Sequence, residues 1–421
     1  MNEETKKRIT AIYNGIIPEG YKKTKVGIVP VEWENVKFSD IFTEKSIRTS
    51  DFKKYPLYSL TIEEGVVPKS ERYERSHLVK KDDVFKMVSK NDFVYNPMNV
   101  RFGALARYKG ERTVSVSGYY DVFSVNDRYS MEYMDNFLLS APMINYYNVV
   151  STGSLKEKQR VHFSQFIEFN LPIPPLPEQQ KIAEILGAQD KLIELQERKI
   201  NQIKTLKKGY LQKMFPKKGC KYPELRFKGF TDAWEEREFS KQYVKVSEKN
   251  DLSFGTDKII SVANMYFKED TKESNDDYMR TYNVMRLGDI AFEGNKSKNF
   301  AHGRFVENTI GDGIVSHVFD VFRPIADYDL LFWKYIINNE GVMGRIMTRC
   351  TKASTMMTNL VADDFLKEKI AVPSLEEQRQ IGSFLNGLDN LITLHQRKLD
   401  EEKQKKKALM QLLLTGKVRC K

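Results

Sequence analysis

The feature of this sequence that most constrains its fold is an internal repeat in which similar residues return 199 positions later. The pairs at this offset include Glu178-Gln179 with Glu377-Gln378, Asp121-Val122-Phe123 with Asp320-Val321-Phe322, Val116 with Val315, and Gln212 with Gln411. Self-similarity at one spacing is typical of a duplicated structural unit. The chain therefore consists of two copies of one unit, and each copy has a variable segment followed by a helical segment.

The variable segments have the pattern of mixed α/β domains. Short runs rich in β-branched and aromatic residues predict strands at 92–95, 114–117 and 258–262, because Gly, Asn, Asp or Pro lie between them. We expect short helices at 131–147 and 328–347. Each segment is long enough to bury a core of its own.

The helical segments have clear starts and a common heptad frame. Pro174 to Pro177 prevent a helix upstream of the first segment, and Ser374 with Glu377 forms a capping-box pattern at the second. The heptads predict that the two helices pack together; the alternative is two unrelated surface helices on separate cores. The residues expected at the interface are Ile182, Leu186, Ile193, Ile200, Ile203, Ile381, Leu385, Leu388, Ile392, His395 and Leu399.

The charge of the chain favours an anionic partner. Lys and Arg number 68 against 57 Asp and Glu, which gives a net charge of +11. Nucleic acid is the simplest such partner, and a basic but inert surface is the alternative. The three cysteines lie far apart, the N-terminus lacks the apolar core of a signal peptide, and no apolar stretch is long enough to span a bilayer. We therefore expect a cytoplasmic protein.

Motifs for catalysis are incomplete in this sequence. Asn96-Pro97-Met98-Asn99 fails the last two positions of the Asn/Asp-Pro-Pro-aromatic tetrad of amino-methyltransferases, and Arg101-Phe102-Gly103-Ala104 has one glycine of a cofactor loop. Thr415-Gly416-Lys417-Val418 lacks the upstream glycine and the hydroxyl of a phosphate loop. The five histidines are scattered, so we expect no metal site and no catalytic residues.

The doubled arrangement resembles that of the DNA-specificity subunits of type I restriction-modification systems. The resemblance covers nearly the whole chain. It rests on the helix entries Pro175-Leu176-Pro177-Glu178-Gln179 and Ser374-Leu375-Glu376-Glu377-Gln378, on the helix tails around Gln212 and Gln411, and on the segment from Arg226 to Glu235.

This resemblance implies an α+β fold with two mixed α/β target-recognition domains, separated by two long conserved helices that pack as an antiparallel coiled coil in a pseudo-twofold repeat. The boundaries that we predict are an N-terminal arm at 1–25, recognition domains at 26–172 and 217–372, and helical regions at 173–216 and 373–421.

The resemblance also implies a function and partners. Each domain reads one half of a split, asymmetric double-stranded DNA target, and the helices set the spacer and dock two methyltransferase subunits. Up to two restriction subunits join, while S-adenosylmethionine, ATP and Mg²⁺ belong to these partners and not to this chain. The alternatives are a self-contained DNA methyltransferase or nuclease with divergent motifs, and a coiled-coil protein without a nucleic-acid role.

Candidate DNA contacts follow from side-chain chemistry, because Arg reads guanine, Asn reads adenine, and Lys grips phosphate. Two matched loops after predicted strands and the segments just before the long helices carry such residues. The candidates are Asn96, Asn99, Arg101, Arg107, Lys109, Lys156, Lys158, Arg160, Lys296, Lys298, His302, Arg304 and Lys352. The alternative for each is a solvated loop residue. Lys207-Lys208 and Lys403 to Lys407 are solvated helix faces, or they approach DNA phosphates or an acidic partner surface.

Overall fold

A computed structural model describes residues 3–69, 85–153, 159–217, 219–268, 275–353 and 357–420. The chain forms two compact units: unit 1 contains Met1–Gln196 and Lys398–Lys421, and unit 2 contains Glu197–Arg397. Each unit therefore holds one variable segment together with a part of both long helices. No helix among the described residues is both long and apolar enough to cross a membrane.

Unit 1 is built around a four-stranded antiparallel sheet with the order β10-β9-β12-β4. Its strands are β1 (Tyr21–Thr24), β2 (Gly27–Pro30), β3 (Glu34–Lys37), β4 (Phe42–Glu44), β5 (Arg48–Thr49), β6 (Tyr58–Thr61), β7 (Gly65–Pro68), β8 (Phe85–Val88), β9 (Phe93–Tyr95), β10 (Leu105–Arg107), β11 (Val114–Val116), β12 (Asp121–Val125) and β13 (Asn170–Ile173). Its shorter helices are α1 (Glu3–Tyr13), α2 (Phe38–Ile41), α3 (Met131–Phe137), α4 (Ala141–Val150), α5 (Phe163–Phe166) and the 3₁₀ helix η3 (Val100–Phe102). The core beneath the sheet is rich in phenylalanine, including Phe38, Phe93, Phe123 and Phe166.

Unit 2 repeats this design with a four-stranded sheet of order β15-β22-β19-β20. Its strands are β14 (Glu235–Glu238), β15 (Tyr243–Val246), β16 (Ile260–Ser261), β17 (Tyr266–Phe267), β18 (Asn283–Met285), β19 (Ile290–Glu293), β20 (Arg304–Glu307), β21 (Gly313–Val315), β22 (Val321–Pro324), β23 (Thr351–Ala353), β24 (Thr358–Leu360) and β25 (Lys369–Val372). Its shorter helices are α7 (Asp276–Met279), α8 (Leu330–Ile336), α9 (Glu340–Cys350), α10 (Ala362–Lys367), and the 3₁₀ helices η5 (Phe239–Lys241) and η6 (Thr256–Lys258). The predicted strands and the two pairs of short helices are confirmed.

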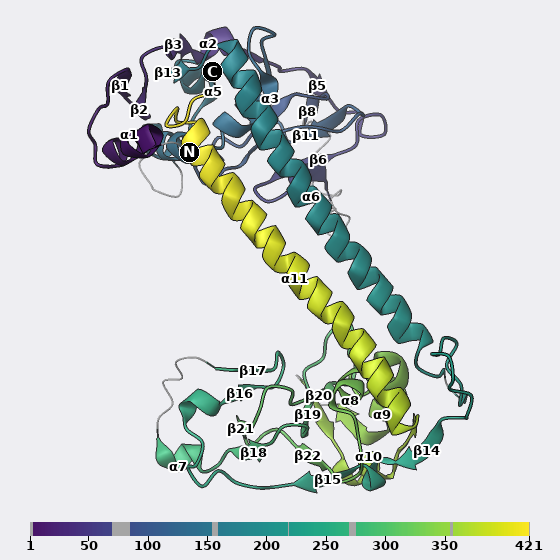
Figure 1. Cartoon of the computed structure of the whole chain (residues 1–421). Helices are drawn as coiled ribbons and strands as arrows, with labels where there is room; N and C mark the ends of the chain where they lie inside the picture. The colour runs from purple at the N-terminus through teal and green to yellow at the C-terminus, as the bar shows by residue number, and fades with distance from the viewer. Residues whose placement is uncertain are drawn as a thin grey trace. The chain divides into compact units, whose positions relative to one another are not determined.

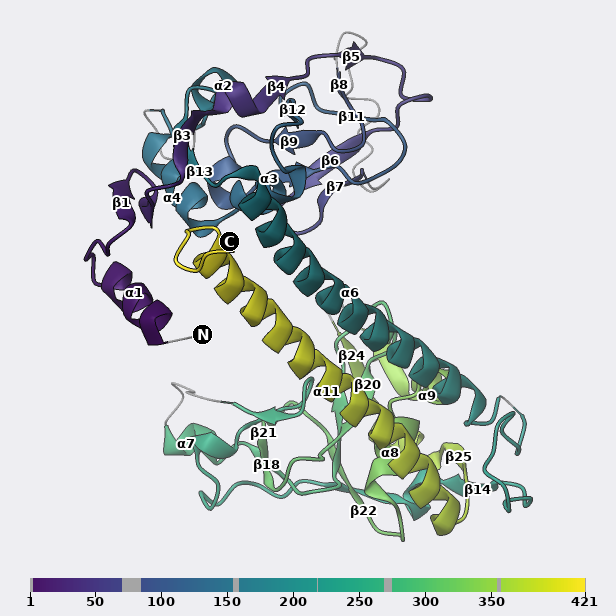
Figure 2. The same cartoon turned by 45° about the horizontal axis from the view of Figure 1, so that its top comes forward.

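The two long helices are α6 (Leu176–Lys213) and α11 (Leu375–Leu413), and they lie side by side (Figures 1 and 2). In unit 1, the ammonium of Lys406 lies 2.6 Å from a carboxylate oxygen of Asp190. In unit 2, Lys207 lies 2.6 Å from Asp389. An early position on one helix therefore faces a late position on the other, and the predicted antiparallel pair is confirmed.

The residues predicted at the interface of the helix pair are mostly buried, and their role in that interface stays a prediction. Seven of the eleven predicted residues are buried, and the remaining four are half-buried: Ile193, Leu388, Ile392 and His395. The heptad position of Gln189 is only 4% exposed, and its amide donates to the backbone oxygen of Glu402 at 3.1 Å. This polar contact inside unit 1 fixes the local register of the pair.

Each long helix ends in the core of a unit, which ties the helices to the domains. Met214 and Phe215, just after α6, are buried with Trp234 and Phe332 in unit 2. Leu413 and Leu414, at the matched end of α11, are buried in the core of unit 1. The core of unit 1 therefore includes residues from the C-terminal end of α11, which closes the second copy of the repeat.

Candidate DNA interface and family

In unit 1 the candidate interface is built around the loop from Asn96 to Gly103, which follows β9. The side-chain oxygen of Asn96 accepts a hydrogen bond from the backbone N–H of Met98 at 3.0 Å, which makes a tight turn. The loop then forms η3, whose Val100 is fully buried, and it ends at Gly103 with φ of 95°. The left-handed conformation favours glycine, so the loop is a firmly held platform. Asn99 is exposed on it.

The segment before α6 packs against this loop, although the two lie far apart in the sequence. The backbone N–H of Val161 donates to the carbonyl of Pro97 at 2.9 Å. Nη1 of Arg101 donates to the side-chain oxygen of Gln159 at 3.1 Å. Two groups of predicted DNA contacts are thus brought together, and Arg160 lies half-buried at their junction. Lys156 and Lys158, also predicted here, lie outside the described residues.

Unit 2 brings the matching segments together in a different way. In unit 1, Tyr95 pairs with Leu105 and nine residues lie between them, whereas in unit 2 Phe292 pairs with Phe305 and twelve residues lie between them. The backbone N–H of Thr358, on β24, donates to the carbonyl of Gly294 at 2.8 Å. A side chain at Gly303 would collide with the carbonyl of Glu293, 2.6 Å from its Cβ position, so glycine is needed for this close approach.

The hairpin that precedes each loop completes the candidate surface. In unit 1, the exposed Ile62 at the β6–β7 turn lies beside Gly103. In unit 2, Nη2 of Arg304 donates to the carbonyl of Ala263 at the β16–β17 turn, at 2.6 Å. We call the loop, the hairpin turn and the segment before the long helix the target face of each unit.

The predicted contact residues differ in how freely they are presented on the target faces. On the target faces, Lys296, Lys298 and Lys352 are exposed. Lys109 is also exposed, but it follows β10 at the opposite end of the β9–β10 hairpin, and its ammonium lies 3.2 Å from Asp135. Arg101, by contrast, is only 8% exposed. Arg304 is held by Glu293 at 2.8 Å, and His302 is half-buried. Asn99 and the exposed lysines of the target faces are therefore the residues best placed to meet a ligand, while the role of each as a DNA contact stays a prediction.

Arg107 has structural partners on a neighbouring helix. Its guanidinium lies 3.0 Å from Glu132 and 3.2 Å from Asp135, both on α3. The matched position on β20 is Glu307, which is 3% exposed, and burial raises the pKa of this carboxyl well above its usual value. A cationic side chain in unit 1 thus corresponds to a buried carboxyl group in unit 2. Arg107 therefore packs its strand against a helix.

For Tyr119-Tyr120 in the turn after β11 and His317 in the matched turn after β21, the sequence leaves two alternatives open: burial in the sheet or contact with DNA. Tyr119 is 47% exposed, and His317 is exposed as well. Since Asp121, the first residue of β12, pairs with Tyr95 at the end of β9, this turn lies at the same end of the sheet as the target loop. Burial in the sheet, which the sequence also allows, is wrong for these two residues; Tyr120 is half-buried.

A Glu-Gln pair at the start of each long helix joins the helix to its domain. The carboxylate of Glu178 accepts from Nε and Nη2 of Arg419 at 2.8 and 2.9 Å, and that of Glu377 accepts from Arg226 at 2.7 and 2.8 Å. The side-chain oxygen of Gln179 accepts from the backbone N–H of Ser130 at 2.9 Å, and Gln378 does the same for Asp329 at 3.2 Å. The sequence shows that this pair recurs, but not what it binds.

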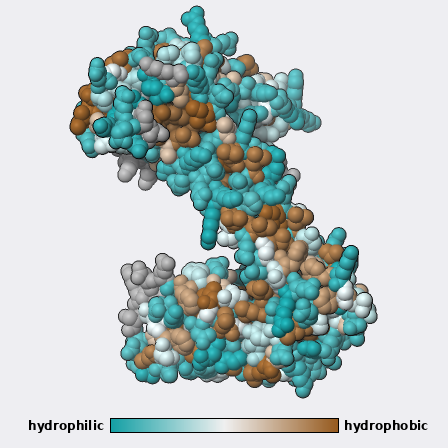
Figure 3. Space-filling model, in the orientation of Figure 1, coloured by the Kyte–Doolittle hydropathy of each residue, from teal (hydrophilic) through white to brown (hydrophobic). Residues whose placement is uncertain are grey.

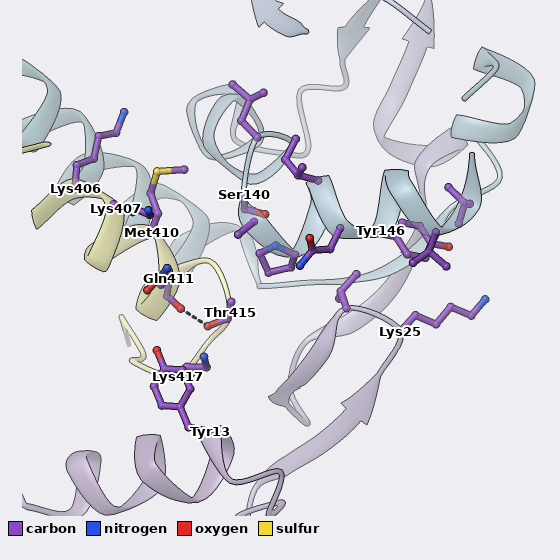
Figure 4. Close-up of a pocket in the computed structure, with 18 of the residues that line it drawn as sticks. Tyr13, Lys25, Ser140, Tyr146, Lys406, Lys407, Met410, Gln411, Thr415 and Lys417 are labelled. Carbon is purple, nitrogen blue, oxygen red and sulfur yellow. Dashed lines mark hydrogen bonds between the residues drawn. The ribbon is translucent and has the colours of Figure 1, made fainter. Parts of the chain in front are cut away.

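A large hollow in unit 1 lies between α4 and the end of α11 (Figure 4). Its volume is about 1210 Å³, and its wall includes Pro142, Ile144, Tyr146 and Met410. Among the described residues that line it, the charged ones are all lysines: Lys25, Lys403, Lys406, Lys407 and Lys417. An apolar wall with a cationic rim suits an acidic protein surface better than a DNA backbone. A protein can cover the apolar wall with its own apolar side chains, whereas phosphates can contact only the lysines.

The described residues contain no group of three or more His, Cys, Asp or Glu side chains arranged to hold a metal ion. The three cysteines form no disulfide bond with one another in the described residues. What the structure offers is thus a pair of domains of one design, each with an irregular, partly basic face beside a long helix. This combination defines a class of protein with two similar mixed α/β domains on a shared helical scaffold.

Comparisons with known proteins agree with this class and identify the family. The family described as "Type I restriction modification DNA specificity domain" matches residues 30–205 and 242–404. The chain therefore belongs to the DNA-specificity subunits of type I restriction-modification systems.

Similar full-length proteins support the same assignment. The chain is 25% identical to the type I restriction enzyme MjaVIII specificity subunit of Methanocaldococcus jannaschii, over 96% of this chain and 97% of that protein. It is 24% identical to the putative MjaX specificity subunit of the same organism, with the same coverage. A solved S subunit from M. genitalium has the same fold, with a TM-score of 0.54, 13% identity, and coverage of 90% of this chain and 96% of that one. A structure described for complex assembly and conformational transition of the type I R-M system gives a TM-score of 0.55 at 13% identity, covering 93% and 99%.

Proposed function

We propose that this chain is the non-catalytic subunit that selects the DNA target of a type I restriction-modification complex, and that each unit reads one half of a split, asymmetric sequence. The observation that carries this proposal is the duplicated target face. Both faces are assembled from the same three segments, yet their loops differ in length and in letters. Two domains that share a fold but differ in their loops suit a DNA target whose two halves have different sequences.

The scaffold part of the proposal is that the antiparallel helices set the distance between the half-sites. Half-sites one helical turn apart lie about 34 Å apart, and a helix of 38 residues is ~57 Å long at 1.5 Å per residue. A packed helix pair keeps such a spacing, whereas a flexible linker lets it vary.

We further propose that two methyltransferase subunits dock on the helices and supply S-adenosylmethionine and the chemistry. Leu192 and Leu195 on α6 are 45% and 53% exposed, and their repeat partners Leu391 and Leu394 on α11 are 44% and 46% exposed. Patches of hydrophobic side chains are also visible along the helices (Figure 3). Exposed apolar pairs suit protein contacts, and the repeat provides one pair in each unit. The lysine-rimmed hollow adds a cationic surface in unit 1.

The docking proposal is tested with Leu192→Asp and Leu391→Asp, each combined with the methyltransferase subunit. Mass measurement of the intact complex should show two methyltransferase subunits on the original chain and one on each variant. Each leucine is about half exposed, so the variants should keep the original thermal midpoint. Two subunits on both variants would contradict this docking site.

The non-catalytic role is tested separately from docking. The purified chain, given S-adenosylmethionine and the target duplex, should transfer no methyl group, and the addition of the methyltransferase subunit should start the transfer. Methylation by the chain alone would instead support a self-contained methyltransferase. Failure to shift target DNA, with the methyltransferase present, would support a structural protein without a DNA role.

A further inference from the structure

The target face of unit 1 carries an aromatic ring that none of the predicted contacts includes. Phe102, the last residue of η3, is 56% exposed. The residues around it are fixed, because Val100 is fully buried and the backbone N–H of Gly103 donates back to Val100. A large apolar side chain is thus held toward solvent by a rigid turn instead of folding into the core.

The guanidinium of Arg101 packs against one face of this ring. Its Cζ lies 4.5 Å from the centroid of the Phe102 ring, which is the geometry of a cation–π contact. The guanidinium is itself anchored, since it donates to Gln159 on the segment before α6. The exposed Ile62 lies on the neighbouring hairpin turn, so the apolar surface at this point has two members.

The same pairing recurs in unit 2 with different residues. Cζ of Arg304 lies 5.1 Å from the ring centroid of Phe300, and Glu293 and the carbonyl of Ala263 hold the guanidinium in place. The spacing differs, because Arg precedes Phe directly in one loop and follows it by four residues in the other. An anchored arginine beneath a phenyl ring is therefore common to two loops that share little else.

We propose that Phe102 inserts between two base pairs of the half-site that unit 1 contacts, with Arg101 holding the ring in position. The inference rests on the proposed function. Exposed apolar side chains that wedge into a base step unstack it and kink the duplex, and aromatic rings regain the lost contact by stacking on the base. Pyrimidine–purine steps open at the lowest cost, so the ring adds specificity for such a step without a hydrogen bond.

The experiment uses the complex of the full chain with its methyltransferase subunit and a target duplex. The fluorescent adenine analogue 2-aminopurine, which brightens when it loses stacking, replaces one base at a time in both half-sites, apart from the adenine that is methylated. We expect the original complex to brighten one step in the half-site of unit 1. Phe102→Ala should abolish that signal and weaken target binding about 5- to 150-fold, the range for loss of one stacked base.

Three further variants make the result specific. Phe102→Trp should keep the signal, because it preserves a stacking ring. Phe300→Ala should leave the half-site of unit 1 unchanged. Tyr222→Ala, which removes a ring that is 58% exposed outside the target faces, should leave both half-sites unchanged.

The outcomes separate this inference from the proposed function. If Phe102→Ala and Phe102→Leu assemble, bind within twofold of the original and keep the brightened step, the wedge is wrong while sequence-specific binding stands. If Phe102→Leu keeps the signal that Phe102→Ala loses, apolar bulk and not ring stacking is responsible, and the stacking part is wrong. If the original complex does not prefer its target over random DNA, the proposed function itself fails.

Discussion

At the scale of single residues, the Glu-Gln pairs show why two side chains return unchanged after 199 positions. Glu178 and Glu377 are 5% and 0% exposed, and each meets one arginine in a two-pronged contact. A buried carboxylate is costly unless it is paired and hydrogen-bonded. The arginine therefore decides whether the start of the long helix can stay folded against its domain.

Arg419→Met should lower the free energy of unfolding of unit 1 by about 3–5 kcal/mol, because it leaves the buried charge of Glu178 unpaired. Arg226→Met is the matched change in unit 2, since both arginine side chains are 14% exposed. Urea unfolding gives the free energy, and hydrogen exchange locates the weakened unit. Equal loss of protection in both units from either change would contradict the pairing.

The Arg419 effect should depend on pH. Burial alone would raise the pKa of Glu178, but hydrogen bonds from Arg419, the backbone N–H of Cys420 and Trp33 hold it below its usual value of 4.5. Because the folded pKa is lowered, the stabilisation is present above the unfolded pKa and is lost as the pH falls through the folded pKa. The difference between the original chain and Arg419→Met, measured by urea unfolding, should therefore be full near pH 7 and shrink below about pH 4.5. A difference in the free energy of unfolding that stays constant over this pH range would contradict the stabilising role of the Arg419–Glu178 pair.

At the scale of elements, the long helices were predictable and the target faces were not. Heptad spacing and helix-start residues are local patterns, so they place α6 and α11 within a few residues. The contact between Pro97 and Val161 depends on how strands pair, which no local pattern reports. For the same reason, the exposure of Phe102 and the burial of Arg101 could not be predicted: both follow from Val100 being drawn into the core.

The helix pair provides a matched test of burial. Leu186 and Leu385, related by the repeat, are both fully buried, whereas Leu192 and Leu391 are 45% and 44% exposed. Leu186→Ala and Leu385→Ala should each cost about 2–5 kcal/mol, because each leaves a cavity. Leu192→Ala and Leu391→Ala should each cost at most about 0.5 kcal/mol. Urea unfolding of the four variants checks this, and equal costs at buried and exposed sites would contradict the heptad frame.

At the scale of the whole molecule, segments from the first and the last parts of the sequence both contribute to unit 1. The hydroxyl of Tyr21 donates to the carbonyl of Gly416 at 2.8 Å, and Leu413 and Leu414 complete the core of the first domain. Gly416 has φ of 67°, and a Cβ there would lie 2.4 Å from Pro30. Each unit is thus assembled from one variable segment and from helical segments that lie both before and after it in the sequence.

The proposed spacer role predicts the result of lengthening the helices. A block of seven residues that keeps the heptad pattern is inserted after Gln196 in α6 and after the matched His395 in α11. Seven residues add ~10 Å, the length of about three base pairs. The methylated sequence should keep its end bases, while the preferred spacer grows by about one to three pairs.

The single-helix insertion, after Gln196 alone, is the control for this experiment. Its partner helix is unchanged, so slippage should absorb part of the added length and give a smaller shift. Active enzyme with the original spacer after the double insertion would show that the helices do not set the distance.

The central claim is that one domain reads one half of the target, and sequencing of methylated DNA tests it most directly. Residues 26–172 are replaced by the corresponding segment of a related specificity subunit, and the methylated motifs of the host genome are determined before and after. We predict that one half-site changes to that of the donor, while the other half-site and the spacer stay the same. A change in both half-sites, or the original motif retained in full, would contradict the account.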